Sequence, residues 1–384
     1  MSGAAAALAM LALVAWLWLL FGRDGFWRSG PELPPLAPRL PTAVDVVVPA
    51  RDEAESVGEC LTSLLGQDHA GPVRVILVDD GSRDATVGIA RGLAGRASPH
   101  RLEVIQGRPA PPGWSGKLWA LEQGIAAARK EASWLLLTDA DVVHAPGHLA
   151  ALLAKAESGG FDLVSEMVAL NCKSLAERAL VPAFVFFFQL LYPFAAVNNP
   201  ARRTAAAAGG TILIRVAALD RAGGVAAIRS ALIDDVTLAK AVKPGGKIWL
   251  GHTHLARSVR AYPGFGDIWR MIARTAFVQL RYSGLLLVAT LLVIGFLFVL
   301  PPAFVLFGSG LARWAGLAAW LLAAALYWPS LRRYRRSPVW APLLPLIAGF
   351  YLAATAGSAN DYWRGRGQVW KDRAYRRAPP GVPT

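Results

Sequence analysis

Long apolar stretches near both ends of the chain constrain its fold more than any other feature. Residues 3–22 (GAAAALAMLALVAWLWLLFG) carry no charge and are about long enough to cross a bilayer as one helix. Residues 284–307, 311–328 and 339–356 are three further apolar stretches, and the first and last of these contain prolines that favour kinks or re-entrant turns. The sequence therefore predicts an integral membrane protein with an N-terminal anchor at 1–22 and transmembrane or re-entrant helices within 283–358.

The charge distribution predicts how such a protein is oriented. Lys and Arg outnumber Asp and Glu by 40 to 26, although the chain is 54% hydrophobic. No Lys or Arg precedes the first apolar stretch, whereas Arg23, Arg28 and Arg39 follow it. Because basic residues favour the cytoplasmic side, we expect an outside N-terminus, a cytoplasmic domain after the anchor, and the bacterial inner membrane as the location. The basic tail at 359–384 suits anionic lipid, and nucleic-acid binding is not expected.

The residues between the membrane stretches alternate between strand-like and helix-like patterns. A Pro-rich linker at 23–42 leads into a region in which four apolar runs predict strands: VDVVVP, VRVILVDD, WLLLTD and GGTILIR. Helical patterns occur near residues 54–66, 85–97, 117–130 and 148–156. This alternation predicts one α/β domain at 43–282 with a Rossmann-like, mainly parallel sheet, whose ligands bind at the carboxyl ends of the strands.

One apolar segment inside this domain has two explanations. The sequence LVPAFVFFFQLLYPFAAV at 180–197 is almost as apolar as the terminal stretches. A buried core helix is the simpler explanation. Its many Phe residues, its Tyr and its two Pro favour a membrane-surface helix through which the domain reaches lipid.

Three acidic pairs lie in the domain, two at strand ends and one at the start of an apolar-periodic segment: Asp79–Asp80, Asp139 with Asp141, and Asp234–Asp235. Turn formation or helix capping would explain each pair taken singly. However, one Asp is enough for a cap, and the DAD spacing of Asp139 and Asp141 suits the hard oxygen ligands of a divalent cation. Lys117, at the start of a predicted helix, can contact a phosphate, with a solvated lysine as the alternative.

Between residues 45 and 281 the chain resembles the inverting family-2 glycosyltransferases of the nucleotide-sugar-binding GT-A fold, in their membrane-anchored form. The resemblance rests on VVVPARDE (46–53), DDGS (79–82), DAD (139–141), GGTILIRVAALDRAGG (209–224) and DD (234–235). It implies transfer of a sugar from a nucleotide-sugar donor, first of all a UDP-sugar, with Mg²⁺ or Mn²⁺ as cofactor.

The same resemblance implies roles for individual residues. The metal would be bound by Asp139 and Asp141, and Asp235 would be the catalytic base, with Asp234 as the next candidate. The family's Gln/Arg-x-x-Arg-Trp motif is echoed in WRMIARTAFVQLRY (269–282), where Arg274 matches the arginine but Thr275 replaces the tryptophan. Including the lysine described above, the predicted donor-binding residues are Pro49, Arg51, Glu53, Asp79, Asp80, Lys117, Asp139 and Arg274.

Two further motifs bear on the acceptor. PPGWSGKLWAL (111–121) and VWKDRAY (369–375) are similar to hopanoid- and carotenoid-pathway members that are related to ceramide glucosyltransferases. This resemblance implies a hydroxyl group of a membrane lipid as acceptor. A polyprenyl-phosphate glycosyltransferase and a catalytically silent membrane adaptor are the alternatives. A dinucleotide-dependent oxidoreductase is not expected, because G-x-G-x-x-G does not follow the first strand.

Overall fold

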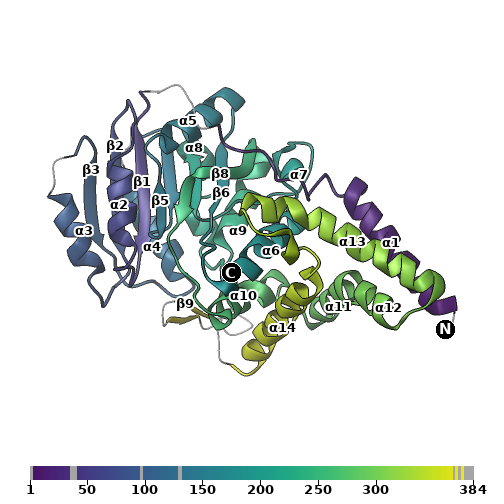
Figure 1. The fold of residues 1–384 in the computed structure, drawn as a ribbon. Helices are drawn as coiled ribbons and strands as arrows, with labels where there is room; N and C mark the ends of the chain where they lie inside the picture. The colour runs from purple at the N-terminus through teal and green to yellow at the C-terminus, as the bar shows by residue number, and fades with distance from the viewer. Residues whose placement is uncertain are drawn as a thin grey trace. The chain divides into compact units, whose positions relative to one another are not determined.

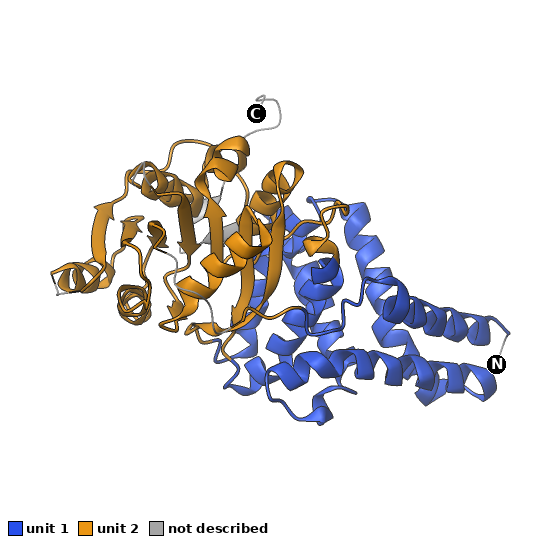
Figure 2. Ribbon diagram, turned by 90° about the horizontal axis from the view of Figure 1, so that it is seen from above, with its two compact units in different colours: residues 1–30, 172–195, 262–369 blue, residues 31–171, 196–261, 370–384 orange. Residues whose placement is uncertain are grey.

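The computed structural model describes residues 3–34, 41–95, 98–128 and 132–365, and the backbone of two short strands, β9 (Gln368–Trp370) and β10 (Arg373–Tyr375). The chain divides into two units, each assembled from separate stretches (Figure 2). The sheet unit comprises residues 31–171, 196–261 and 370–384. The helical unit comprises residues 1–30, 172–195 and 262–369.

The sheet unit is built on eight strands: β1 (Val44–Ala50), β2 (Val73–Asp79), β3 (Arg101–Gln106), β4 (Trp134–Thr138), β5 (Val142–His144), β6 (Leu163–Ala169), β7 (Thr211–Arg215) and β8 (Ile248–Ser258). They form one sheet in the order β3-β2-β1-β4-β7-β6-β8-β5 (Figure 1). The pairs β1–β2, β1–β4, β2–β3 and β6–β8 are parallel, whereas β7 runs antiparallel to β4 and β6, and β5 antiparallel to β8. The predicted mainly parallel α/β fold is therefore confirmed, and the run GGTILIR supplies an antiparallel strand within it.

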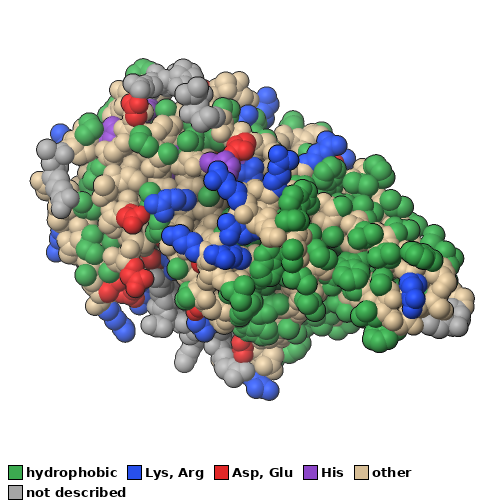
Figure 3. Space-filling model, in the orientation of Figure 1, with side chains coloured by type: hydrophobic (Ala, Val, Ile, Leu, Met, Phe, Trp, Pro, Cys, Tyr) green, Lys and Arg blue, Asp and Glu red, His purple; other side chains and the backbone are tan. Residues whose placement is uncertain are grey.

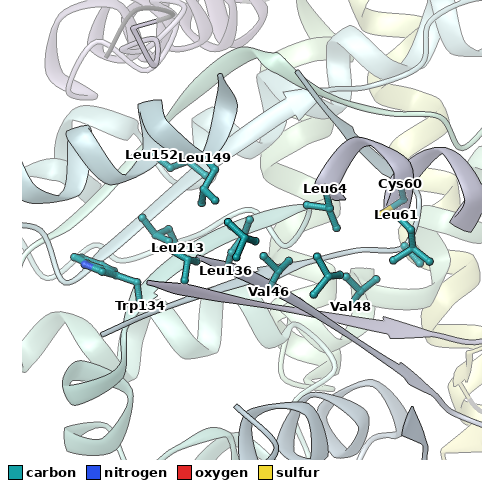
Figure 4. Close-up of a cluster of buried hydrophobic side chains, with 14 of the residues drawn as sticks. Val46, Val48, Cys60, Leu61, Leu64, Trp134, Leu136, Leu149, Leu152 and Leu213 are labelled. Atoms are coloured by element: carbon teal, nitrogen blue, oxygen red, sulfur yellow. The ribbon is translucent and has the colours of Figure 1, made fainter. Parts of the chain in front are cut away.

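Helices cover both faces of this sheet. They are α2 (Val57–Leu65), α3 (Thr86–Ala94), α4 (Gly116–Ala126), α5 (His148–Gly159), α8 (Val216–Arg221) and α9 (Asp234–Val242), with the short 3₁₀ turns η1 (Val225–Ile228) and η2 (Lys243–Gly245). Every residue of β1 is buried, as a strand covered on both faces requires. Val46 and Val48 pack into a core with α2 and α5 (Figure 4). Val47 meets α4 so closely that a Cβ on Gly124 would lie 2.3 Å from its Cγ1. This glycine lets α4 lie directly on β1, which fixes the start of α4 near the strand ends.

The helical unit contains α1 (Gly3–Gly22), α6 (Leu175–Leu191), α10 (Phe265–Gln279), α11 (Gly284–Ile294), the π-helical turn η3 (Gly295–Val299), α12 (Leu300–Phe307), α13 (Gly310–Arg333), the 3₁₀ turn η4 (Pro338–Trp340) and α14 (Leu344–Trp363). The short α7 (Phe194–Asn198) lies where the chain passes between the units. Within the described residues, three helices are long and apolar enough to cross a membrane: Gly3–Gly22, Gly284–Phe307 and Gly310–Arg333. Large apolar side chains are exposed along them (Figure 3). The expected stretch at 339–356 is divided between η4 and α14, and neither is among these three.

The prolines of the second candidate span are accommodated without a re-entrant turn. Pro301 has no N–H, so the carbonyl of Leu297 lacks its usual helical donor four residues on. The indole Nε1 of Trp16 on α1 donates to that carbonyl at 2.9 Å, and η3 absorbs the irregularity. Because a carbonyl without a partner is costly in lipid, this contact stabilises the pairing of α1 with the Pro-containing helix.

Two of the candidate spans, α1 and α13, are aligned so that their basic ends lie together. At one end, Ala9 of α1 packs with Phe304 and Ala312, close to the turn between α12 and α13. At the other end, the Arg333 guanidinium donates to the carbonyl of Ser29 at 3.3 Å. The arginines after α1 and those at the end of α13 therefore lie on the same side of this helical group.

Residues 180–197 fall within α6 and α7. Most of α6 is buried, and Phe186 lies 5.5 Å from Phe26 and 5.4 Å from Tyr327 between ring centroids. Phe186 thus packs against α13 and the turn that follows α1, and a membrane-surface role for residues 180–197 stays a prediction.

Two predicted domain boundaries also change. Residues 172–195 and 262–282, expected within the 43–282 domain, belong to the helical unit, because their apolar faces pack against helices of that unit. Of the expected linker at 23–42, residues 23–30 belong to the helical unit and residues 31–34 to the sheet unit, where the Leu33 N–H donates to the carbonyl of His252 at 2.8 Å. Residues 35–40 of this linker and residues 366–367, 371–372 and 376–384 of the basic tail lie outside the described residues.

Candidate active site

Strand register brings the predicted site segments to one edge of the sheet. β1 and β4 are parallel, with Val47 opposite Leu137, so their carboxyl ends lie together. β7 runs the other way, and Thr211 at its start lies opposite Thr138 at the end of β4. A hollow of about 340 Å³ lies at this edge. The residues that line it include Pro49, Lys117, Thr138, Asp139, Gly209, Asp234 and Asp235. Apolar side chains from α4, β4, β7, η1 and α9 form the remainder of the lining.

Lys117 joins two of the acidic pairs. It lies in the first turn of α4, whose N-terminus is capped by Ser115. Its Nζ lies 2.9 Å from Asp139 Oδ1 and 3.1 Å from Asp234 Oδ2. Burial lowers the pKa of Lys117, but the two carboxylates outweigh it and the net effect is a raised pKa. The ammonium is thus a fixed positive charge in the hollow, and the solvated-lysine alternative does not describe it.

The DAD carboxylates lie in different environments. Burial raises the pKa of Asp139, the Lys117 ammonium opposes that shift, and nearby Asp141 adds to it. Asp141 is mostly buried and accepts hydrogen bonds from Ser258 Oγ at 2.9 Å and Arg260 Nε at 3.0 Å. Arg260 also contacts Glu53 Oε1 through Nη2 at 2.7 Å. Arg260 therefore links a predicted metal ligand to a predicted donor-binding residue.

The two DAD side chains fit a divalent cation shared with a substrate. In the described part of the chain, no group of three or more His, Cys, Asp or Glu side chains could enclose a metal. Mg²⁺, however, is commonly held by one or two carboxylates together with substrate phosphates and water. Asp139 and Asp141 supply that donor set, and both are already partnered by cationic side chains. The chemistry of these ligands therefore suits Mg²⁺ or Mn²⁺ bound together with a phosphorylated ligand.

Asp235 has the properties of a proton acceptor. Its Oδ2 accepts from the Gly209 N–H at 2.8 Å, and its Oδ1 accepts from the Val236 N–H at 2.7 Å. Burial and the neighbouring Asp234 carboxylate raise the pKa of Asp235 to about 7, against the opposing effect of Lys117. A carboxyl with such a pKa, oriented by two backbone donors, can accept a proton near neutral pH.

Asp79 and Asp80, two of the predicted donor-binding residues, make different contacts. Asp79 stabilises its own turn, accepting from the N–H groups of Gly81 at 3.2 Å and Ser82 at 3.1 Å and from Gln106 Nε2 at 2.8 Å. The turn explanation therefore describes Asp79 well. Asp80 is also buried, and it faces Arg51.

Arg51 and Arg274 occupy different units. Arg51 is 4% exposed, donates to the Asp80 carbonyl at 2.6 Å and lies 3.7 Å from its carboxylate. Arg274 lies on an exposed face of α10 in the helical unit. Donor binding by Arg51, Asp80 and Arg274 remains a prediction from the sequence.

Sequence reasoning missed two residues of the site. Ser258 ends β8 and Arg260 follows it, so both reach Asp141 across more than a hundred residues of sequence. Neither belongs to a recognisable motif. The available signal was a basic residue just beyond a strand end, which is too common to single out Arg260.

Comparison with known proteins identifies the domain that contains most of these residues. Residues 45–223 match the glycosyl transferase family 2 model. An N-acetylglucosaminyltransferase of Mesorhizobium japonicum is 37% identical over 158 residues, which is 39% of this chain and 35% of the relative. An undecaprenyl-phosphate 4-deoxy-4-formamido-L-arabinose transferase of Shewanella sediminis is 32% identical over 119 residues, 30% of this chain and 34% of the relative. The chain thus spans about a third of the length of each of these relatives.

A solved structure extends the comparison to nearly the whole chain. A mannosyltransferase from Pyrobaculum calidifontis, in complex with GDP-Man and Mn²⁺, superposes with a TM-score of 0.58. The two sequences are 20% identical, and the match covers 93% of this chain and 99% of the other. Residues 45–223 are therefore similar to family 2 glycosyltransferase domains, and the chain has the GT-A fold with additional apolar helices.

Proposed function

We propose that the protein is an inverting glycosyltransferase that moves a sugar from a nucleoside-diphosphate sugar to a hydroxyl group of a membrane lipid. One observation supports this most directly. Asp235, a buried carboxyl with a pKa of about 7, lines the same hollow as Asp139 and Lys117. A proton acceptor thus lies beside the groups suited to a diphosphate.

The residues of the hollow suggest a division of labour. Asp235 accepts the proton of the acceptor hydroxyl as that oxygen bonds to the anomeric carbon. The bond from that carbon to the diphosphate breaks from the opposite side, and its electron pair leaves with the phosphate oxygen. Lys117 offers a positive charge to the departing diphosphate. Asp139 and Asp141 would hold Mg²⁺ or Mn²⁺, which when bound neutralises charge on the leaving group.

The properties of Asp235 favour a hydroxyl acceptor over a phosphate. A phosphate monoester is largely ionised at neutral pH, so it attacks without a base. A hydroxyl attacks more readily when a base removes its proton, and such a base contributes roughly 10²- to 10⁴-fold in rate. A polyprenyl-phosphate acceptor, suggested by the name of the Shewanella relative, is the second candidate. The ordered charge pairs of the hollow argue against a silent adaptor.

Product analysis tests the proposed function. Membranes with and without the protein are supplied with a panel of UDP- and GDP-sugars, and their lipids are compared by mass spectrometry. We expect one donor, first of all a UDP-sugar, to give a glycosylated neutral lipid, with hopanoid-type alcohols as the first acceptors to examine. A product found only on polyprenyl phosphate would favour the second candidate. No protein-dependent product with any donor would contradict glycosyl transfer.

The alignment of the apolar helices predicts their orientation in the inner membrane. Arg23, Arg28 and the arginines at 332–336 lie at one end of the candidate spans, with Arg313 near the other. Because the basic end favours the cytoplasm, we expect the turn at Ser309 to face outward and Ser337 inward. The catalytic domain, which follows the basic end of α1, is then cytoplasmic, where nucleotide sugars are made.

Cysteine labelling checks this orientation. Ser309 and Ser337 are both exposed, so Ser309→Cys and Ser337→Cys form a matched pair. A membrane-impermeant maleimide is expected to label Ser309→Cys in intact cells, and Ser337→Cys only after lysis. The unsubstituted protein reports background from its two native cysteines, of which Cys60 is buried. The reverse labelling pattern would show that the domain faces outward.

A further inference from the structure

A chain of polar side chains crosses the interior of the sheet unit, and the proposed mechanism does not use it. Thr138 ends β4, His144 ends β5, His148 begins α5 and Glu166 lies in β6. His148 and Glu166 are fully buried, and His144 is 4% exposed. Groups that form hydrogen bonds in an apolar core are expensive to bury unless their geometry is satisfied. We refer to these four residues as the buried histidine chain.

The contacts of the buried histidine chain are continuous. Glu166 Oε1 contacts His148 Nε2 closely, and His148 Nδ1 lies 2.8 Å from His144 Nδ1. His144 Nε2 lies 3.2 Å from Thr138 Oγ1. The Thr138 hydroxyl in turn donates to the carbonyl of Gly210 at 2.8 Å. A connected path thus runs from Glu166 to the loop that precedes β7.

The number of protons on each group determines which group donates in these hydrogen bonds. A hydroxyl has one proton, so when Thr138 donates to Gly210 it must accept from His144 Nε2. Burial lowers the pKa of His144 well below its usual range, and His148 adds to this effect, so His144 is neutral and its Nδ1 accepts. His148 Nδ1 must then be the donor to His144. The bonds from His148 to His144, from His144 to Thr138 and from Thr138 to Gly210 therefore all point towards Gly210.

The remaining proton lies between His148 and Glu166. Glu166 contacts this path through Oε1, and among the described residues its Oε2 is a buried oxygen without a hydrogen-bond partner. A glutamine at this position keeps a hydrogen-bonding group against His148, whereas a methionine removes it.

The end of the path lies between the two halves of the candidate active site. Thr138 immediately precedes Asp139, and Gly210 immediately follows Gly209, whose N–H holds Asp235 Oδ2 at 2.8 Å. The bond from Thr138 to Gly210 therefore joins the donor-side carboxylate to the segment that holds the proton acceptor. Ser165, the neighbour of Glu166, binds the same loop by accepting from the Ala208 N–H at 2.8 Å.

We propose that Glu166, His148 and His144 are positioning residues, which hold the Thr138 hydroxyl on the Gly210 carbonyl and so fix the separation of Asp139 from Asp235. The proposal rests on the proposed function, since it concerns the placement of those two carboxylates for transfer. A displacement of about 1 Å between reacting groups can cost roughly 10²-fold in rate. The chain thus acts on the catalytic step and not on donor affinity.

Paired substitutions at Glu166 test this proposal. Glu166→Met keeps approximate length but removes the hydrogen-bonding group, and Glu166→Gln keeps such a group against His148. We expect Glu166→Met to lower kcat by about tenfold or more, with the donor dissociation constant within about twofold of wild type. Glu166→Gln is expected to retain most of kcat. His100→Leu is the matched control, because His100 is also buried in the sheet unit but contacts Gln67 instead of the site.

Hydrogen exchange supplies a readout that needs no substrate. In Glu166→Met we expect the amides of residues 208–211 to exchange faster than in wild type, and in Glu166→Gln and His100→Leu to exchange as in wild type. If Glu166→Met does not fold, Thr138→Val removes the same link to Gly210 with a side chain of nearly the same shape. Faster exchange at 208–211 and a lower kcat are expected for that variant too.

The outcomes separate this proposal from the proposed function. If wild type transfers sugar and Glu166→Met loses no more kcat than His100→Leu at equal melting temperature, the positioning role is wrong and the function stands. If Glu166→Gln is as impaired as Glu166→Met, a hydrogen-bonding group against His148 is not what matters, and the proposal is also wrong. If wild type transfers no sugar, the proposed function fails, and the exchange at 208–211 alone decides whether the chain fixes this loop.

Discussion

Replacement of Asp235 by Asn is expected to lower kcat by about 10²- to 10⁴-fold, which corresponds to roughly 3–5 kcal/mol of transition-state stabilisation. Asn keeps the shape of the side chain and can still accept the N–H of Gly209, but it cannot accept a proton. The donor is expected to bind nearly as in wild type, because the groups suited to the diphosphate are Lys117, Asp139 and Asp141. Product formation with a radiolabelled donor and calorimetry of donor binding measure the two quantities separately.

The pH dependence supplies an independent check on Asp235. Burial raises its pKa from 3.8 to about 7, so below pH 7 it is mostly protonated and cannot act as a base. We therefore expect the wild-type kcat to rise with pH through about 7 and then to level off. The residual rate of Asp235→Asn should lack this rise. The same rise in both proteins would assign it to another group.

Asp234→Asn is the matched control for Asp235→Asn. Asp234 is adjacent to Asp235, but its carboxylate contacts Lys117, 3.1 Å away. The proposed mechanism predicts a smaller loss of kcat for Asp234→Asn, caused by release of the lysine. Near-normal turnover by Asp235→Asn together with a large loss in Asp234→Asn would transfer the role of base to Asp234.

The strands could be predicted from the sequence where both of their faces are buried. β1, β2 and β4 are covered on both faces, so they occur as continuous apolar runs. β6 and β8 were not predicted, because their buried positions include polar residues such as Ser165, Glu166 and His252. Those polar residues are buried because distant segments satisfy them, and a local pattern cannot reveal that.

The division into units illustrates the same limit. The apolar pattern of residues 180–197 fits a membrane-surface helix or a buried one, and it does not specify what the segment packs against. Partners such as Phe26 and Tyr327 lie more than a hundred residues away. The meeting of the acidic pairs was more predictable, because the strand ends of one sheet lie at a common edge. Asp139, Asp234 and Asp235 do line one hollow. Arg260 was not predictable, because its contacts with Asp141 and Glu53 depend on where β8 enters the sheet.

Removal of divalent cations is expected to abolish transfer, and Mg²⁺ or Mn²⁺ is expected to restore it. The leaving diphosphate must be stabilised as its bond breaks, and Lys117 supplies a single positive charge that it already shares between Asp139 and Asp234. The Mn²⁺ reported with the Pyrobaculum mannosyltransferase supports the same expectation for this chain. Protein treated with EDTA and then supplied with graded Mg²⁺ or Mn²⁺ provides the measurement.

Direct binding measurements assign the metal to particular side chains. Asp139→Asn and Asp141→Asn are each expected to weaken Mn²⁺ binding in the presence of nucleoside diphosphate by at least about tenfold, as followed by electron paramagnetic resonance. Asp235→Asn is the control and should bind Mn²⁺ as wild type does.

Full turnover after EDTA treatment would contradict the metal assignment. Lys117 and Arg260, which already partner the two DAD carboxylates, would then be the cations available to neutralise the diphosphate. In that case Lys117→Met, which keeps the length of the side chain without its charge, should cause a loss of kcat comparable to that expected for metal removal.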